Sequence, residues 1–256
     1  MTLTLRSSVG VGGANQPADV LALTTWLAAR GYLDCATDYA DDPLFKSILL
    51  LQSIRRGRRT VPAIGSDRYV DGRLDPGGQT VAWCSSGAAP SWGRLPASGP
   101  GWVRPQAVKG QGVSPDGHDF GTSWLADAIA HAGAAYAAKR RSAMHGWPDL
   151  AVNDLSLGDG GDTPEHAGHE TGLDVDLFLP RIDGTYGAIT VRSVDAKGAP
   201  CDHPLYDREA MRAQLRAWLD APKARRALLN DPVLIAEGLC SAAPGHDNHA
   251  HGEVGP

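Results

Sequence analysis

Two short histidine-rich segments, residues 166–176 and 246–251, constrain this chain more than any other feature. They read HAGHETGLDVD and HDNHAH, and together they hold five of the nine histidines. Imidazole nitrogens and carboxylate oxygens are ligands that zinc accepts, whereas a hydrophobic core has no need of so many histidines. We therefore expect one zinc site built from both segments. The fold must then bring the end of the sequence beside residues 166–176.

The first segment can supply two ligands if it turns in its middle. His169 and Asp176 can converge when a glycine turn at Gly172 folds a loop onto a strand over residues 173–179. Side chains alternate along a strand, so Asp174 and Asp176 share one face and either could point at the metal.

The second segment offers two imidazoles on one face of a short terminal strand. His249 and His251 are two residues apart, so one can bind zinc while the other remains a base. Two histidines and one carboxylate would leave a fourth position open for water, as a zinc hydrolase requires. The zincin helix HExxH is absent, because Glu170 is followed by Thr-Gly-Leu.

Composition narrows the class of protein. The chain has 256 residues, 21% charged and 42% hydrophobic, with a net charge of −5. This is the balance of an ordinary globular protein, and it gives no reason to expect a nucleic-acid partner. No run approaches the roughly 20 apolar residues that span a bilayer. The four cysteines permit the disulfides Cys35–Cys84 and Cys201–Cys240, or free thiols, and both readings stay open.

Periodicity divides the chain into two domains. Residues 1–84 form a small helical module, with helices after Pro17, from Asp42 and from Thr80. Residues 85–101, rich in Ser, Gly, Ala and Pro, form a linker. The domain over 102–256 mixes helices at 122–141, 206–219 and 233–239 with strands at 150–152, 173–179, 227–229 and the C-terminus. Without βαβ regularity, this indicates an α+β fold with a small, mainly antiparallel sheet.

The helical module resembles a known cell-wall domain. Two amphipathic helices followed by DGRLDPGGQT are similar to the peptidoglycan-binding-like domain, a three-helix module of cell-wall hydrolases, over nearly all of residues 1–84. The alternative is a helical cap that packs on the other domain.

The second domain resembles a family of zinc peptidases. H-x6-D followed by a distant HxH is similar to the group that includes lysostaphin-type enzymes, D-Ala-D-Ala metallopeptidases and the hedgehog fold. HAGHETGLDVDLF, HDNHAH and DLSLGDGG are most similar to the penicillin-insensitive murein endopeptidases, over about residues 103–256. The resemblance implies one Zn²⁺ per chain, held by His169, Asp176 and His251. It also implies His249 as the catalytic histidine, with His166 and His246 as further active-site histidines. Gly168 departs from the family, which usually has a serine there.

This resemblance implies a zinc-dependent peptidoglycan hydrolase. The expected reaction is cleavage of D-alanyl–meso-diaminopimelyl cross-links by zinc-activated water. Two alternatives remain: a D,D- or L,D-carboxypeptidase that trims stem peptides, and a non-catalytic zinc-containing protein that binds the wall.

The expected place of action is the cell wall, in the periplasm. The first eight residues, MTLTLRSS, do not resemble a secretory signal. We therefore expect synthesis in the cytoplasm and a non-classical route: release as a phage lysin, or injection as a toxin by a secretion apparatus, with an immunity protein as a possible partner. A trimmed leader is a further alternative.

Overall fold

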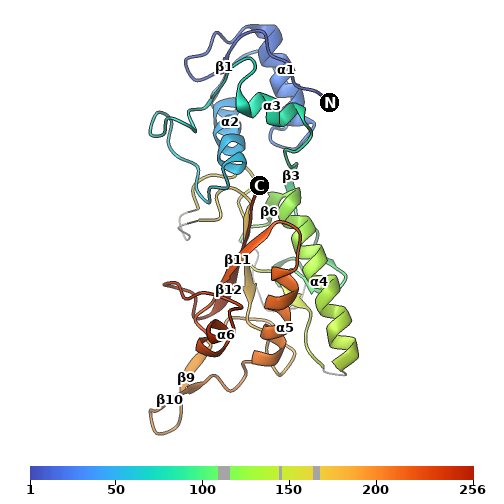
Figure 1. The fold of residues 1–256 in the computed structure, drawn as a ribbon, viewed down its shortest axis with the longest axis vertical. Helices are drawn as coiled ribbons and strands as arrows, with labels where there is room; N and C mark the ends of the chain where they lie inside the picture. The colour runs from blue at the N-terminus through green and yellow to red at the C-terminus, as the bar shows by residue number, and fades with distance from the viewer. Residues whose placement is uncertain (109–115, 144–145, 164–167) are drawn as a thin grey trace.

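The computed structural model describes residues 1–108, 116–143, 146–163 and 168–256. Figure 1 shows an elongated molecule with the N-terminal helices at one end and the later helices and strands at the other. Helices and several small, mainly antiparallel sheets are mixed, which confirms the α+β expectation. The helices of the described part are α1 (Pro17–Ala28), α2 (Asp42–Arg55), α3 (Gln79–Ser85), α4 (Ser123–Ala143), α5 (Arg208–Leu219) and α6 (Pro232–Ala236), with a 3-10 turn at Pro105–Ala107.

The N-terminal end contains the three helices expected over residues 1–84. Pro17 occupies the first turn of α1, where its missing N–H costs nothing. Asp41 caps α2 by accepting the Leu44 backbone N–H at 3.1 Å. The sequence did not predict the short antiparallel pair β1 (Val9–Gly10) and β2 (Arg73–Leu74) that joins this end together. The helices bury a common set of apolar side chains: Leu23, Trp26, Leu27, Leu44, Ile48, Leu51 and Ile54.

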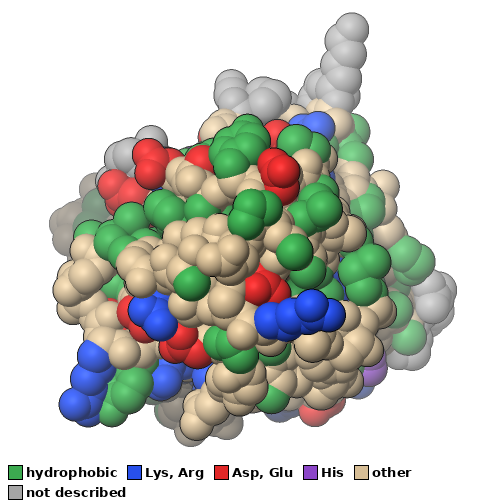
Figure 2. Space-filling view, turned by 90° about the horizontal axis from the view of Figure 1, so that it is seen from above, with side chains coloured by type: hydrophobic (Ala, Val, Ile, Leu, Met, Phe, Trp, Pro, Cys, Tyr) green, Lys and Arg blue, Asp and Glu red, His purple; other side chains and the backbone are tan. Residues whose placement is uncertain are grey.

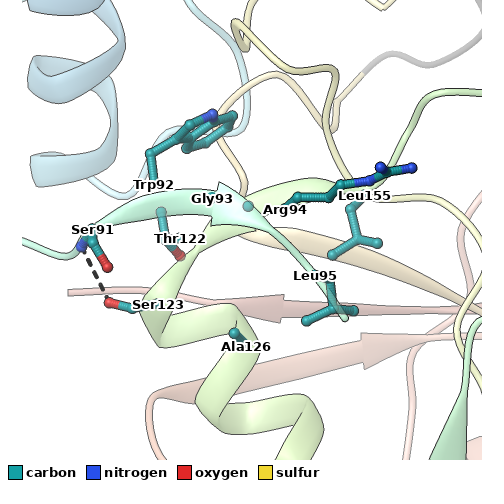
Figure 3. A pocket seen from close by; sticks show the side chains of 10 residues that line it. Ser91, Trp92, Gly93, Arg94, Leu95, Thr122, Ser123, Ala126 and Leu155 are labelled. Atoms are coloured by element: carbon teal, nitrogen blue, oxygen red, sulfur yellow. Dashed lines mark hydrogen bonds between the residues drawn. The ribbon is translucent and has the colours of Figure 1, made fainter. Parts of the chain in front are cut away.

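Residues 85–101, expected to be a linker, are paired along part of their length. They carry β3 (Trp92–Arg94), antiparallel to β6 (Phe120–Thr122), and β4 (Ser98–Gly99), antiparallel to β5 (Trp102–Val103). Figure 3 shows β3 beside β6 where the chain enters α4, with the Ser91 backbone N–H donating to Ser123 Oγ at 3.2 Å. This segment is thus packed against later elements, and the division into domains stays a prediction.

Trp92 of this segment contacts residues from both ends of the molecule. Its ring is buried, stacks on Tyr32 at a centroid distance of 6.2 Å, and donates from Nε1 to the Gly158 carbonyl at 2.6 Å. Gly31, which ends the α1 turn at φ +80°, is close by: a Cβ there would lie 2.2 Å from the Trp92 carbonyl oxygen. Both the positive φ and the close approach require glycine at this position.

The main sheet has the strand order β11-β12-β8 and is antiparallel throughout. Its strands are β11 (Ala224–Leu228), β12 (His249–Val254) and β8 (Asp174–Phe178), so the C-terminal strand lies in the centre. All three agree with strands predicted from the sequence. The parallel partner of β5 is β7 (Leu150–Ala151), and β9 (Arg192–Val194) and β10 (Pro200–Asp202) form a separate antiparallel pair.

Helices α4 and α5 pack against each other beside this sheet (Figure 1). Trp218 of α5 lies directly on β12, because a Cβ added at Gly252 would meet its ring at 2.5 Å. Side chains alternate along β12, so His249, His251 and Glu253 face the side away from Trp218. The apolar face of the sheet thus lies under the helix, and the polar face is left for the histidines.

The remaining features concern the surface and the cysteines. Basic, acidic and apolar side chains are interspersed on the N-terminal end of the molecule shown in Figure 2.

All four cysteines are free thiols, so neither Cys35–Cys84 nor Cys201–Cys240 is a disulfide. Within the described ranges, no helix has both the length and the apolar character needed to cross a membrane.

Candidate metal centre

The register of two strands brings the two histidine-rich segments together. In the antiparallel pair β12–β8, His251 lies opposite Asp176 and Glu253 lies opposite Asp174. Residues that face each other across such a pair point to the same side of the sheet. The polar face therefore collects side chains from both segments, as the sequence required.

Three candidate ligand atoms converge within this face. His169 Nε2 lies 3.2 Å from Asp176 Oδ1 and 3.2 Å from His251 Nδ1, and His251 Nδ1 lies 2.8 Å from Asp176 Oδ1. Ligand atoms around a tetrahedral zinc, each bound at about 2.0–2.1 Å, lie roughly 3.3 Å apart. All three side chains are at least 98% buried. The spacing and the donor types of these three residues therefore fit a tetrahedral metal ion.

His169 reaches this cluster from a tightly held loop. Its φ of +65° is uncommon for a residue other than glycine. The Ser156 hydroxyl contacts the His169 carbonyl and accepts the Gly172 backbone N–H at 2.7 Å. Gly172 has a φ of +62°, and a Cβ there would lie 2.4 Å from the Trp92 ring. The glycine turn predicted at this position is present, and Ser156 acts on the loop backbone.

A second layer of carboxylates lies behind His251. Its Nε2 is 3.5 Å from Asp174 Oδ1 and 3.7 Å from Glu253 Oε1. Burial lowers the pKa of His251, but the carboxylates of Asp174 and Asp176 outweigh it and raise the pKa to about 9. Burial has the opposite effect on an acid and raises the pKa of Asp176. The neighbouring His169 and His251 outweigh this and hold the pKa of Asp176 well below its usual value. Asp174 is not among the three converging residues, but with His251 and Glu253 it forms a second group whose possible ligand atoms lie within 4.8 Å of one another.

His249 and His246 lie at the more open side of the cluster. His249 is about one-fifth exposed, and its Nε2 is 3.5 Å from Asp176 Oδ2. Its Nδ1 lies 2.7 Å from Asn248 Oδ1, which can fix the ring orientation. Burial lowers the pKa of His249, although Asp176 opposes this, so the neutral ring is favoured. The His246 ring centroid lies 4.9 Å from that of His249 and 5.4 Å from that of His251.

One predicted site residue lies outside the described part of the chain, and several possible metal ligands were not predicted from the sequence. His166 lies outside the described residues, so its active-site role stays a prediction. Glu253 was not predicted as part of the site, although the alternation of side chains along HAHGEV places it on the same face as His251. A further group of possible ligand atoms, from Asp116, His118 and Asp154, was also not predicted, since Asp154 is distant in sequence from the other two.

Two cavities of the described part of the chain lie away from the histidine cluster. The pocket of Figure 3, about 190 Å³, lies around β3 and β6 and includes none of the candidate ligands. A larger cavity of about 620 Å³ lies between α2 and the glycine-rich loop 157–162. That loop is bonded to the ligand segment, because the Gly161 N–H donates to the Glu170 carbonyl at 2.8 Å.

The sequence of this chain matches a known family model. The family model described as penicillin-insensitive murein endopeptidase matches residues 78–224, which is more than half of the chain. The matched range includes His169 and Asp176 and ends before the second histidine segment. No curated protein matches the chain.

Proposed function

Because the chain belongs to the penicillin-insensitive murein endopeptidase family, we propose that it is a zinc-dependent enzyme that cleaves D-alanyl–meso-diaminopimelyl cross-links. Family membership makes it a peptidase with peptidoglycan as its substrate and the cell wall as its place of action. The zinc requirement and the particular bond are the parts that we propose.

The observation that supports zinc most strongly is the convergence of His169 Nε2, Asp176 Oδ1 and His251 Nδ1 within 3.2 Å of one another. Two imidazoles and one carboxylate are the donor set of many catalytic zinc sites. Zinc bound by these residues would polarise the scissile carbonyl and lower the pKa of water towards about 7.

The chain's own side chains then supply the proton transfers. His249 is half-buried beside Asp176, and its lowered pKa keeps a ring nitrogen available to accept a proton from the attacking water. The same ring can deliver that proton to the departing amine. His246 lies beside His249, where its ring can contact the substrate. We propose the same kind of substrate or oxyanion contact for His166 on the basis of the family resemblance.

The N-terminal helices are proposed to bind peptidoglycan and to hold the enzyme on its polymeric substrate. The sequence similarity to the three-helix wall-binding module supports this role, and residues 1–84 contain the helices α1, α2 and most of α3. A module that binds the same polymer as the active site raises the local concentration of cross-links.

Three measurements test the proposal. Elemental analysis of purified protein should give about one zinc per chain, and chelation should abolish activity. Digestion of cross-linked muropeptide dimers should yield monomers. Loss of a terminal alanine alone would instead identify a carboxypeptidase. Zinc binding without any cleavage would identify a wall-binding protein, and absence of bound metal would contradict the metal site itself.

A further inference from the structure

Arg59 follows α2 in the N-terminal helical part, yet its guanidinium reaches the layer behind the candidate ligands. Its Nε lies 3.5 Å from Asp174 Oδ1, and its Nη1 lies 3.4 Å from Glu253 Oε1. The Asp174 side chain is completely buried, whereas Arg59 is about one-third exposed. A cation from one end of the molecule therefore meets buried carboxylates of the other.

Asp174 connects this arginine to two of the candidate ligands. Its Oδ2 accepts the His169 backbone N–H at 3.2 Å, and its Oδ1 lies 3.5 Å from His251 Nε2. His251 directs Nδ1 toward Asp176, so Nε2 is the atom through which its orientation can be set. Carboxylates that bind the outer nitrogen of a ligating histidine fix the tautomer and the ring plane. The position of Asp174 thus bears on both histidines.

The backbone around Arg59 is bonded to the same ligand segment. The Glu170 N–H donates to the Arg59 carbonyl at 3.2 Å, and the Val61 N–H donates to Glu170 Oε2 at 2.6 Å. The Thr171 hydroxyl donates to the Arg58 carbonyl at 2.7 Å. These bonds hold the start of the Arg59 side chain at a defined place beside the loop that carries His169.

Gly168 leaves the space that the guanidinium occupies. A Cβ at this position would lie 2.7 Å from Arg59 Nη2. The end of an arginine side chain can move aside, so a larger residue would be accommodated, but only if the guanidinium gave up its place beside Asp174. The absence of a side chain at Gly168 therefore leaves room for the guanidinium beside Asp174.

We propose that Arg59 is a positioning residue of the metal centre, through which the N-terminal helical part completes the layer behind His169 and His251. The inference rests on the zinc site proposed above. Among the described residues, Arg226 also pairs with Glu253, at 2.7 Å, but no second arginine or lysine lies within ion-pair distance of Asp174. A buried carboxylate that loses its cation is strongly destabilised, so without Arg59 Asp174 would no longer hold the two ligands in place.

Electrostatic repulsion alone predicts the opposite effect of removing Arg59. Arg59 is a cation near a cation site, and simple Coulomb repulsion would make its removal tighten metal binding. Positioning predicts the reverse. Loss of partners that orient metal ligands typically weakens metal affinity about 10- to 100-fold.

The experiment measures zinc affinity of the full-length protein by competition with a chelator. Arg59→Met, which keeps the volume and removes the charge, should weaken affinity about 10- to 100-fold. Arg59→Lys, which keeps the charge, should lie closer to wild type. Arg55→Met is the matched control, because Arg55 is also in the N-terminal helical part but bonds to Gln79 at the surface. It should bind zinc as wild type does.

The outcomes separate this inference from the proposed function. A wild-type protein that binds no zinc contradicts the metal site. A wild-type protein that binds zinc while Arg59→Met binds it equally or more tightly overturns the role of Arg59. Arg59→Lys as weak as Arg59→Met would also overturn it, since the positive charge beside Asp174 would then not account for the loss.

Gly168 gives an independent readout of the same geometry. Gly168→Ala should weaken zinc affinity in the wild-type background by displacing the guanidinium. In the Arg59→Ala background the same substitution should have little further effect. Additive effects of the two changes in a double-mutant cycle would show that the two positions act separately, contrary to the proposal.

Discussion

Asp176 presents its two carboxylate oxygens to different partners. Oδ1 lies 3.2 Å from His169 Nε2 and 2.8 Å from His251 Nδ1, while Oδ2 lies 3.5 Å from His249 Nε2. The buried Asp176 side chain therefore lies next to both the candidate ligands and the candidate base. Its replacement should affect the metal and the chemistry together, whereas replacement of the base should affect the chemistry alone.

Asp176→Ala is expected to abolish zinc binding, because it removes the only carboxylate among the three converging atoms and leaves two histidines. Zinc per chain, measured after dialysis, should fall from about one to near zero, and activity should be lost with it. Asp127→Ala, at an exposed position of α4, is the control and should keep its zinc. Stoichiometric zinc in Asp176→Ala would remove Asp176 from the ligand set.

His249→Ala is expected to keep zinc and lose turnover. The ring is not among the three converging atoms, but it can carry the proton between water and the leaving amine, a role typically worth about 10²- to 10⁴-fold in rate. Rates on muropeptide dimers and zinc content measured on the same samples test this. His131→Ala on the exposed side of α4 serves as the control. A fully active His249→Ala enzyme would contradict the mechanism.

At the scale of elements, β12 serves two functions at once. Its alternate residues supply His249, His251 and Glu253 to the metal side of the sheet. The residues between them pack under α5, where Gly252 lies against the Trp218 ring. Because β12 is the central strand, paired on both edges, it cannot shift to relieve a clash on one face without disturbing the other.

Gly252→Ala should therefore be destabilising despite its small size. The added Cβ would lie 2.5 Å from Trp218, and overpacking of this kind costs about 1–3 kcal/mol in the free energy of unfolding. Gly93→Ala is the matched control, since Gly93 also lies in a strand but has open space around a Cβ and needs no positive φ. It should change stability by less than about 0.5 kcal/mol. Equal denaturation midpoints for the two variants would argue against the tight Trp218 contact.

For the whole molecule, the contacts between the two ends are numerous and polar as well as apolar. Tyr32 stacks on Trp92 and donates to the Pro90 carbonyl at 3.0 Å, and Glu170 accepts the Val61 N–H at 2.6 Å. The N-terminal helices are thus packed onto the peptidase part at two separate places. They are not simply tethered to it.

We expect the chain to unfold in a single transition for this reason. Thermal melts followed by tryptophan fluorescence and by far-UV circular dichroism should coincide. Added zinc should raise the midpoint of that one transition, because a ligand of the native state stabilises everything that unfolds with it. Two transitions, of which only the later one responds to zinc, would instead show two independent domains.

Much of the fold follows from local sequence patterns. The helices at Pro17–Ala28, Asp42–Arg55 and Ser123–Ala143 lie where apolar periodicity and capping residues predicted them, and so do the strands of the main sheet. Strands β3 and β4, within residues 85–101, carried no such pattern. They are only two or three residues long, and pairing with distant partners, not their own composition, makes them strands.

Sequence by itself determined that His249 and His251 share one face of their strand, that Asp174 and Asp176 share one face of theirs, and that a turn lies at Gly172. These are consequences of strand alternation and backbone conformation among neighbouring residues. Only the tertiary structure decided that the β12–β8 register sets His251 opposite Asp176.

The tertiary structure also decided that Arg59 enters the layer behind the ligands. Contacts of this kind join residues more than a hundred positions apart. They depend on how whole elements dock, because the spacing of residues along the chain carries no information about which distant side chain will fill a given space.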